Sequence, residues 1–202
     1  MTHIYFIRHG DYIEDLENGA YKDLGLSQEG IGQMERLRDR LTRTGEIKAD
    51  VFIASPMRRA RESAEILAPA LAVPIVFDKD FEEWLCDDGT LPPDEFSALW
   101  RQVPEAQKPF YRFMAGYETG LEFSVRVQAA LQRILQEYEG KTIVLVSHGG
   151  VIAASFSYFF GLSGAVPSRV SLGAKNASIT HWVKPENAQK WALECYNDYH
   201  HL

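Results

Sequence analysis

The 202-residue sequence has little cysteine, no long apolar run and fewer basic than acidic side chains. Cys86 and Cys195 are too few for a disulfide scaffold or a cysteine-based metal cluster, which favours a reducing compartment. No stretch approaches the roughly 20 apolar residues that a membrane-spanning helix needs, and residues 2–7 show neither a basic leader nor a cleavage site. These absences predict a cytoplasmic protein without a membrane partner.

Acidic residues outnumber basic ones by 28 to 21, and the formal net charge is −7. This balance argues against nucleic acid as the main partner, although a local basic pocket is compatible with it. Hydrophobic residues make up 46% of the chain and charged residues 24%, a composition that suits one soluble domain with ample core. We therefore expect a single domain over residues 1–202, and nothing in the sequence indicates its oligomeric state.

Strand and helix patterns alternate along most of the chain. Apolar residues recur at three- and four-residue spacing from Glu29 to Thr44, after Ser27 as a helix N-cap, and Ser55-Pro56 is typical of a second helix start. Strands are expected at 4–7, 51–54, 75–77, 142–146, 179–183 and 191–195, with further helices around 127–138 and from 149 to about 160, the last capped by Gly161. The order predicts a three-layer α/β/α sandwich with a mostly parallel central sheet.

Two stretches interrupt the alternation. Asp11 to Gly25 is polar, carries Asn18-Gly19 and is expected to be a loop. Residues 84–120 contain turn signals and many aromatics, which predicts a short, mainly helical lid insertion over the strand ends, with one helix at Pro93–Gln102. Two interpretations of the insertion are open. Its aromatics form a small core under the lid, or a basic side chain reaches a carboxylate or second phosphate of a substrate, the candidates being Arg101, Lys108 and Arg112.

Two of the expected strands end in the same way, in Arg8-His9-Gly10 and in Ser147-His148-Gly149-Gly150. If these strands are neighbours, two imidazoles meet at the carboxyl edge of the sheet, where ligands bind in α/β folds. The glycines leave backbone N–H groups free to approach an anion, and a helix starting at Gly149 directs its positive end there. Arg58 and Arg59 follow a third strand. Such a pocket indicates a phosphate or sulfate site rather than a metal site, because arginines repel a metal ion.

The motifs, taken together and in order, resemble those of a known family. The matching stretches are Arg8-His9-Gly10, Asp23 to Gly30, Ser55 to Ala60 with Ser63-Ala64, Val146 to Gly150, Asn176-Ala177-Ser178, and Asn197-Asp198 with His201-Leu202. In this combination they are similar to the signatures of the histidine phosphatases, the phosphoglycerate mutase-like superfamily. The resemblance spans nearly the whole chain outside residues 84–120.

This resemblance implies roles for individual residues. His9 would be the nucleophile and become a phosphohistidine, while Arg8, Arg59 and His148 would hold the phosphoryl oxygens together with the backbone at Gly149. Arg59 lies in register with the family's arginine. Its neighbour Arg58 points about 100° away on a helix and is expected to be solvated or ion-paired.

The family's general acid and base is a glutamate shortly after the third strand, and Glu83 fits that position, with Glu82 facing solvent. The following run, Trp84 to Gly89, departs from the family pattern, so Asp87 or Asp88 could compete for the role. A second departure follows Gly10. There Asp11, Tyr12 and Asp15 replace the usual residues, which puts the usual substrate contacts of that loop in doubt. Ser147 is expected to be a helix cap, since adjacent Ser and His do not form triad geometry.

The sequence thus predicts a metal-independent phosphomonoester hydrolase that needs no cofactor and acts on a small phosphorylated substrate. Within the same chemistry the alternative is a cofactor-dependent phosphoglycerate mutase, which must shelter its phosphoenzyme from water and tends to have a larger insertion. An alternative of another class is a non-catalytic module that binds phosphorylated ligands. That module would be expected to have lost His9, Arg59 or His148. Fold-level analogy does not name the substrate.

Overall fold

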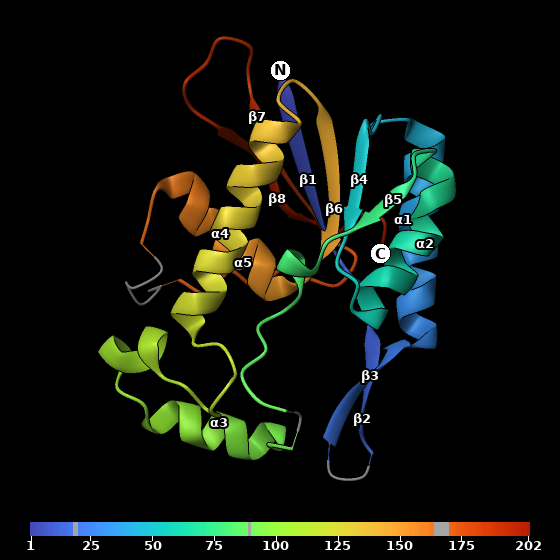
Figure 1. The fold of residues 1–202 in the computed structure, drawn as a ribbon. Helices are drawn as coiled ribbons and strands as arrows, with labels where there is room; N and C mark the ends of the chain where they lie inside the picture. The colour runs from blue at the N-terminus through green and yellow to red at the C-terminus, as the bar shows by residue number, and fades with distance from the viewer. Residues whose placement is uncertain (18–19, 89, 164–169) are drawn as a thin grey trace.

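A six-stranded sheet lies at the centre of the computed structural model, which describes residues 1–17, 20–88, 90–163 and 170–202 (Figure 1). The strand order is β5-β4-β6-β1-β7-β8, with β1 (Thr2–Arg8), β4 (Val51–Ala54), β5 (Ile75–Phe77), β6 (Thr142–Ser147), β7 (Ile179–Lys184) and β8 (Ala192–Asp198). β5, β4, β6 and β1 run parallel, whereas β7 is antiparallel to both β1 and β8. The mostly parallel sheet and the final strand pair are confirmed.

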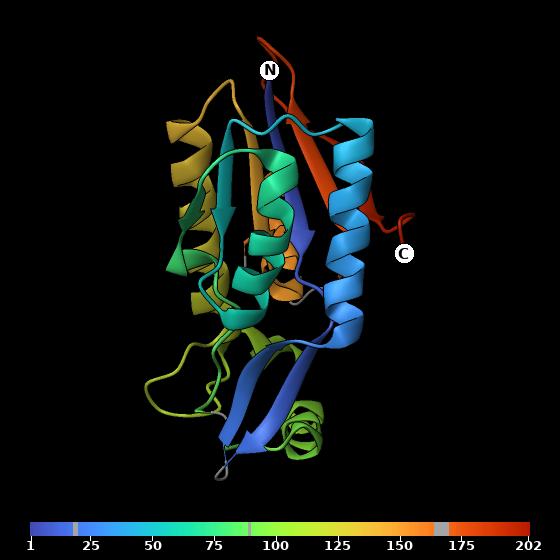
Figure 2. The same ribbon diagram turned by 90° about the vertical axis from the view of Figure 1, so that its right-hand side faces the viewer.

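Helices cover both faces of the sheet, as Figures 1 and 2 show. α1 (Gln28–Thr44) and α2 (Arg58–Leu71) lie on one face, and α4 (Gly120–Glu137) and α5 (Gly149–Phe160) on the other. Successive side chains of β1 point to opposite faces of the sheet and pack in two separate cores. Phe6 packs with α4 and α5, whereas Ile7 packs with α1 and α2. This arrangement confirms the expected three-layer α/β/α fold.

The predicted caps of α1 and α5 are confirmed. Ser27 Oγ accepts a hydrogen bond from the Gly30 N–H at 3.0 Å, and Gly161 follows α5 with φ 66°. The cap predicted at Ser55-Pro56 is wrong, since α2 begins at Arg58 after Met57 and Ser55 Oγ lies 2.9 Å from His148 Nε2. Ser147 is not a helix cap either, because its hydroxyl donates to the Phe81 carbonyl at 2.7 Å. The Ser55 hydroxyl therefore contacts His148 and the Ser147 hydroxyl contacts the backbone of Phe81, so neither caps a helix.

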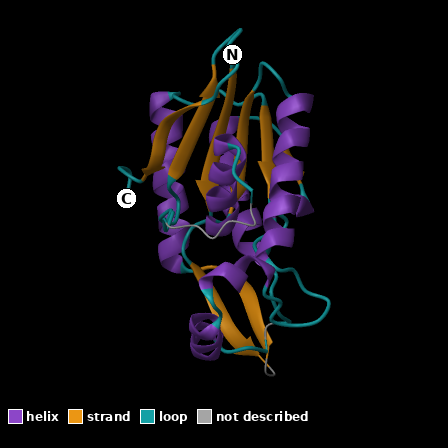
Figure 3. Ribbon diagram, turned by 90° about the vertical axis from the view of Figure 1, so that its left-hand side faces the viewer, coloured by secondary structure: helices purple, strands orange, loops and turns teal. Residues whose placement is uncertain are grey.

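The stretch from Asp11 to Gly25 is not the loop that the sequence predicts. It forms β2 (Tyr12–Glu17) and β3 (Ala20–Leu26), an antiparallel pair, and the Asn18-Gly19 turn between them lies outside the described residues. Figure 3 shows this hairpin projecting beyond the central sheet. The two strands satisfy their main-chain groups by pairing with each other, so a polar sequence forms them without contributing to the central sheet.

The insertion contains α3 (Pro93–Gln102), as predicted, and a 3₁₀ helix, η2 (Glu105–Phe110). A shorter 3₁₀ turn, η1 (Lys79–Phe81), precedes the insertion. It lies beyond the carboxyl end of β1 (Figure 1). Its aromatic rings cluster, with centroid separations of 4.5 Å for Phe96 and Phe113 and 5.7 Å for Trp84 and Trp100. The three candidate basic side chains are held locally: Arg101 donates to the Ser97 carbonyl, Lys108 pairs with Glu105 and Arg112 pairs with Glu122. These contacts favour the aromatic-core interpretation.

Among the described residues, no helix is both long and apolar enough to cross a membrane.

The strand β6 lies between β4 and β1, and all of its residues after Thr142 are buried. Leu145 is fully buried on β6, and its replacement by alanine is expected to lower the free energy of unfolding by about 2–5 kcal/mol, because a cavity remains. Val76 on the edge strand β5 is 51% exposed and serves as the control, with an expected loss within about 0.5 kcal/mol for Val76→Ala. Urea unfolding of both variants measures the difference, and equal losses would contradict the assignment of β6 to the core.

Candidate active site

The pairing of β1 with β6 brings the two predicted histidines together. The strands run parallel with Arg8 opposite Ser147, and the His9 N–H donates to the Ser147 carbonyl at 2.9 Å. The imidazole centroids of His9 and His148 are 5.2 Å apart, and the residues are 2% and 0% exposed. The condition that the sequence argument required, that the two strands be neighbours, is met.

The hydrogen bonds of His9 define the state of its ring. Nδ1 lies 2.7 Å from the carbonyl oxygen of Gly10, so Nδ1 carries the proton and donates it to that oxygen. Nε2 then carries no proton, and its lone pair accepts a hydrogen bond from Arg59 Nε at 3.2 Å. Burial, and secondly the Arg59 charge, lower the pKa of His9 to about 3. The ring is therefore neutral near pH 7, with Nε2 facing cations.

Two guanidinium groups, those of Arg59 and Arg8, contribute positive charge near the His9 ring. Arg59, only 6% exposed, forms an ion pair with Asp23 at 3.0 Å, and the same carboxylate oxygen accepts the Arg59 backbone N–H at 3.1 Å. Arg8 donates through Nη1 to the Ala174 carbonyl at 2.6 Å, while its buried Nε has no partner among the described residues. A Cβ at Gly149 would lie 3.6 Å from that Nε, so the glycine leaves the space beside it open.

His148 is oriented from the neighbouring strand. Its Nε2 lies 2.9 Å from Ser55 Oγ, at the end of β4, and its buried Nδ1 has no partner in the described part of the chain. Burial, followed by the charge of Arg59, lowers the pKa of His148 well below its ordinary value. When the Ser55 hydroxyl donates to Nε2, Nδ1 carries the ring proton and can donate it to an anion.

Glu83 reaches the same helix start from the other side. Its Oε2 accepts the Gly150 N–H at 3.0 Å and its Oε1 accepts the Trp84 N–H at 3.0 Å. A side chain at Gly150 would collide with Oε1. The Glu83 N–H points to the sulfur of Met57 at 3.4 Å, and that sulfur is 4.0 Å from Arg59 Nη2, so Glu83 and Arg59 flank one side chain.

The competing carboxylates lie in local contacts instead. Asp87 accepts a hydrogen bond from the Cys86 thiol at 3.4 Å, and Asp88 is exposed and accepts the backbone and hydroxyl of Thr90. Glu82 is half-buried and borders, with Lys79 and others, a hollow of about 390 Å³. Of the acidic residues considered from the sequence, Glu83 is the one held against the start of α5.

Three supporting residues were not assigned roles from the sequence. Asp23 anchors Arg59, Ser63 Oγ accepts the Gly10 N–H at 3.1 Å, and Asn176 Nδ2 donates to the His9 carbonyl at 3.1 Å. All three belong to the stretches that carried the family resemblance, which is the signal that could have found them. Arg58 is 58% exposed and paired with Glu62 at 2.7 Å, as predicted.

Two of the three residues that depart from the family pattern after Gly10 have structural partners. Asp11 Oδ2 accepts a hydrogen bond from Ser27 Oγ at 2.5 Å, which fixes the entry to α1. Tyr12 lies edge-on to the His9 ring with centroids 5.1 Å apart, and its own ring faces the Arg59 guanidinium at 4.5 Å. The side chain of Asp15 lies outside the described residues. Tyr12 therefore walls the His9 pocket on the hairpin side.

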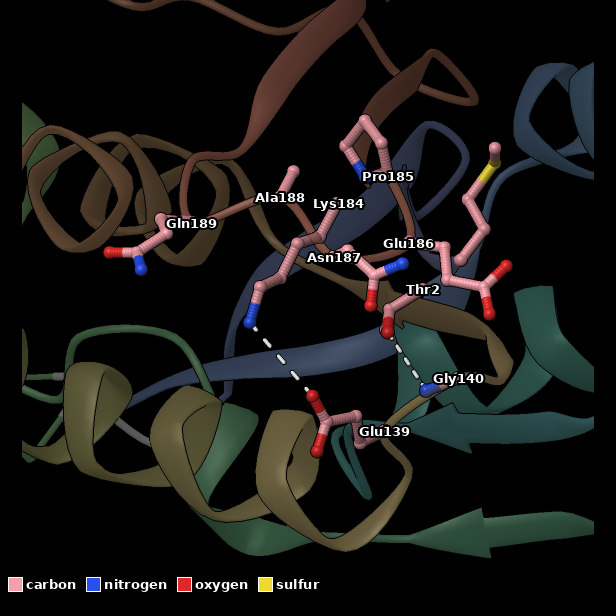
Figure 4. Close-up of a pocket in the computed structure, with 10 residues that line it drawn as sticks. Thr2, Glu139, Gly140, Lys184, Pro185, Glu186, Asn187, Ala188 and Gln189 are labelled. Carbon is pink, nitrogen blue, oxygen red and sulfur yellow. Dashed lines mark hydrogen bonds and ion pairs between the residues drawn. The ribbon is translucent and has the colours of Figure 1, made fainter.

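A larger hollow, of about 610 Å³, lies at the opposite end of β1 from His9 and contains none of these residues (Figure 4). Thr2, Glu139 and Lys184 are among the side chains that line it, and Lys184 Nζ lies 3.9 Å from Glu139 Oε1. Among the described residues, no group of three or more His, Cys, Asp or Glu side chains could hold a metal ion. The His9 cluster, with its two imidazoles and two guanidinium groups, lies apart from this hollow.

Fold and site together define an α/β protein whose strand ends bring together two imidazoles, two guanidinium groups and the carboxylates of Asp23 and Glu83. Residues 4–199 match the model of the histidine phosphatase superfamily (branch 1). The chain belongs to this superfamily.

Relatives carry two kinds of name. "Uncharacterized phosphatase PhoE" of Bacillus subtilis is 27% identical over 202 residues, which cover 100% of this chain and 97% of that protein. "Probable phosphoglycerate mutase GpmB" of an Enterobacter species is 30% identical over 213 residues, covering 100% of this chain and 95% of that protein. Similarity at full length to both therefore supports a phosphatase or a mutase.

Solved structures share the fold. A phosphoserine phosphatase mutant from Entamoeba histolytica, in complex with phosphoserine, matches with a TM-score of 0.72 at 20% identity and covers 100% of both chains. A mycobacterial glucosyl-3-phosphoglycerate phosphatase complexed with VO₃ matches with a TM-score of 0.74 at 21% identity, over 96% of this chain and 98% of that one.

The neutral state of His9 can be measured directly. In wild type the ¹⁵N resonances of the His9 ring should show no protonation between pH 8 and 5, because burial and Arg59 lower its pKa to about 3. Arg59→Met should raise that pKa. Arg58→Met is the matched control, since the neighbouring Arg58 is exposed and paired with Glu62, and should leave the pKa unchanged.

The lowered pKa of His9 also makes the stability of the folded protein depend on pH. The unfolded chain protonates His9 near pH 6.5 and the folded chain near pH 3, so the unfolded state binds more protons between these values. Its contribution to stability is present above pH 6.5 and is lost as the pH falls through that window. A His9 resonance that titrates near pH 6.5 in the folded protein would contradict the assignment.

Proposed function

We propose that the protein is a metal-independent phosphomonoester hydrolase that works through a phosphohistidine on His9. The observation that carries this proposal is the neutral His9 ring, with Nδ1 hydrogen-bonded to the Gly10 carbonyl and the Nε2 lone pair directed at Arg59. A nucleophilic nitrogen needs a free lone pair, and a phosphoryl group carries negative charge on its oxygens. Both requirements meet at Nε2.

In the first step Nε2 attacks phosphorus and the bond from phosphorus to the ester oxygen breaks. When the substrate binds, before this attack, Arg59 transfers its hydrogen bond from Nε2 to a phosphoryl oxygen, which frees the Nε2 lone pair. The Nε–H of Arg8 and the Nδ1–H of His148 serve the other oxygens, with the Gly149 backbone at the positive end of α5. The Gly10 carbonyl stabilises the positive charge that develops on the imidazole through Nδ1. Phosphoryl transfer relies on such positioning and charge stabilisation.

Glu83 serves as the general acid and base. Its protonated carboxyl gives a proton to the departing ester oxygen, and its carboxylate afterwards takes a proton from the water that attacks the phosphohistidine. Inorganic phosphate leaves and His9 is neutral again. The position of Glu83 at the Gly150 N–H, beside Met57 and Arg59, supports this assignment over Asp87 or Asp88.

We propose a small phosphorylated metabolite as the substrate, supported by the complexes of the Entamoeba histolytica phosphoserine phosphatase with phosphoserine and with 3-phosphoglyceric acid. A phosphoglycerate mutase is the second candidate, favoured by the relative of that name at 30% identity. That relative is matched over 95% of its own length, so the size of the insertion does not by itself separate the two reactions.

Turnover of an aryl phosphate in the presence of a chelator tests the nucleophile. His9→Ala should lower kcat by roughly 10³-fold or more, because the covalent route is lost. Arg59→Met should lower kcat/KM by roughly 10²–10³-fold, as removal of one transition-state donor does, whereas the matched variant Arg58→Met should stay close to wild type. Activity that depends on added metal, or that survives in His9→Ala, would contradict the proposal.

Hydrolysis and mutase activity are separated by the fate of the phosphoryl group. With 3-phosphoglycerate and a catalytic amount of 2,3-bisphosphoglycerate, a hydrolase releases inorganic phosphate and forms no 2-phosphoglycerate. Simultaneous assay of phosphate and of the phosphoglycerate isomers measures this ratio. Isomerisation much faster than phosphate release would assign the protein to the mutases.

A further inference from the structure

Four successive backbone carbonyls in the segment that ends at Glu83 are bound by side chains. The Phe81 carbonyl accepts the Ser147 hydroxyl at 2.7 Å, and the other three accept hydrogen bonds from Arg126 on α4. Arg126 Nη1 donates to Asp80 O at 2.8 Å and to Glu82 O at 3.1 Å, and Nη2 donates to Glu83 O at 3.4 Å. Apart from the short turn η1, this segment belongs to no helix or strand, so Arg126 replaces the regular hydrogen bonds that would fix its backbone.

The guanidinium is itself held by Glu118, at the end of the insertion. Arg126 Nε donates to Glu118 Oε1 at 2.6 Å and Nη2 donates to Oε2 at 2.8 Å, a bidentate pair in which the side chains are 20% and 26% exposed. The backbone of Glu118 returns to the residues after Glu83. Its N–H donates to the Leu85 carbonyl at 3.0 Å, and its carbonyl accepts the Trp84 indole N–H at 3.0 Å.

The two residues thus hold the Glu83 segment on both sides, Arg126 at residues 80, 82 and 83 and Glu118 at residues 84 and 85. α4 packs with α5 in one core, and the first residues of α5 bind the Glu83 carboxylate through the Gly150 N–H. A continuous chain of contacts therefore runs from α5 through α4 and Arg126 to the backbone of Glu83. A displacement of that backbone would move the Glu83 carboxylate relative to His9.

We propose that Arg126, braced by Glu118, is a positioning residue for Glu83 that sets the carboxylate for proton transfer and ties the insertion to the acid. This inference rests on the proposed function. Arg126 itself touches neither the His9 pocket nor a reacting atom in the structure. A general acid must lie within hydrogen-bond reach of the oxygen that it protonates, so a small displacement of its backbone weakens proton transfer.

Leaving-group dependence tests the proposal, because a good leaving group needs no proton. kcat/KM is measured for 2,4-dinitrophenyl phosphate, 4-nitrophenyl phosphate and phosphoserine, an alkyl ester. Arg126→Met should lose roughly 10- to 100-fold on the alkyl ester, a part of the 10²–10⁴-fold that a general acid supplies, and little on the dinitrophenyl ester. Arg126→Lys keeps the charge and should recover part of the loss.

Arg133→Met is the matched control on the same helix. Arg133 pairs with the carboxylates of Asp78 and Asp80 at 2.7 and 3.2 Å, is 48% exposed, and donates to no backbone carbonyl of the segment among the contacts of the described residues. It should show no leaving-group-dependent loss. In a Glu83→Gln background Arg126→Met should add no further dependence on the leaving group, since the two changes act on one step.

The outcomes separate this inference from the proposed function. If Glu83→Gln shows a strong leaving-group dependence and Arg126→Met lowers all three rates equally, Arg126 is only structural and the inference is wrong. If Glu83→Gln itself shows no such dependence, the acid assignment is wrong and the inference falls with it. Should Arg126→Met fail to fold, Arg126→Lys and Glu118→Gln carry the same comparison, and a uniform loss in both would overturn the proposal.

Discussion

The parallel pairing of β1 with β6 is the constraint on which the site depends. It sets Arg8 opposite Ser147, so His9 and His148, which follow these residues in the chain, lie side by side at the carboxyl end of the two strands. The two rings then lie 5.2 Å apart in a buried position, and α5 starts directly behind them. A slip of one residue would turn every side chain of β1 to the other face of the sheet and separate the histidines.

Burial and charge give this arrangement its chemistry. Buried guanidinium groups are costly unless they are paired, and Asp23 compensates Arg59 through both its side chain and its backbone. The same cation and the same burial keep His9 neutral, with its proton fixed on Nδ1 by the Gly10 carbonyl. Asp23, on the hairpin strand β3, thus stabilises the buried charge of Arg59, and the ring directs Nε2 at that cation.

Much of the fold and the centre of the site could be predicted from the sequence, because apolar periodicity and strand-end motifs are local signals. The β-strands that carry His9 and His148, the helix at Gly149 and the exposed, ion-paired Arg58 are found as expected. The hairpin of β2 and β3 was missed although Asn18-Gly19 is a hairpin-turn signal, because its polar strands pair only with each other and so lack a clear apolar alternation. Contacts of Ser55, Ser147 and Arg126 join elements far apart in the chain, and no pattern within one element encodes them.

The central claim is that Nε2 of His9 receives the phosphoryl group, and the position of the phosphate on the ring tests it most directly. The enzyme is quenched in alkali during turnover of a ³²P-labelled monoester, because phosphohistidine is stable to base and labile to acid, and the labelled peptide is mapped by mass spectrometry and by ³¹P NMR against the two phosphohistidine isomers. We expect label on the peptide containing His9, as the Nε2 isomer, since Nδ1 is occupied by its hydrogen bond to Gly10. Label on Nδ1, on another residue, or none during turnover would contradict the claim.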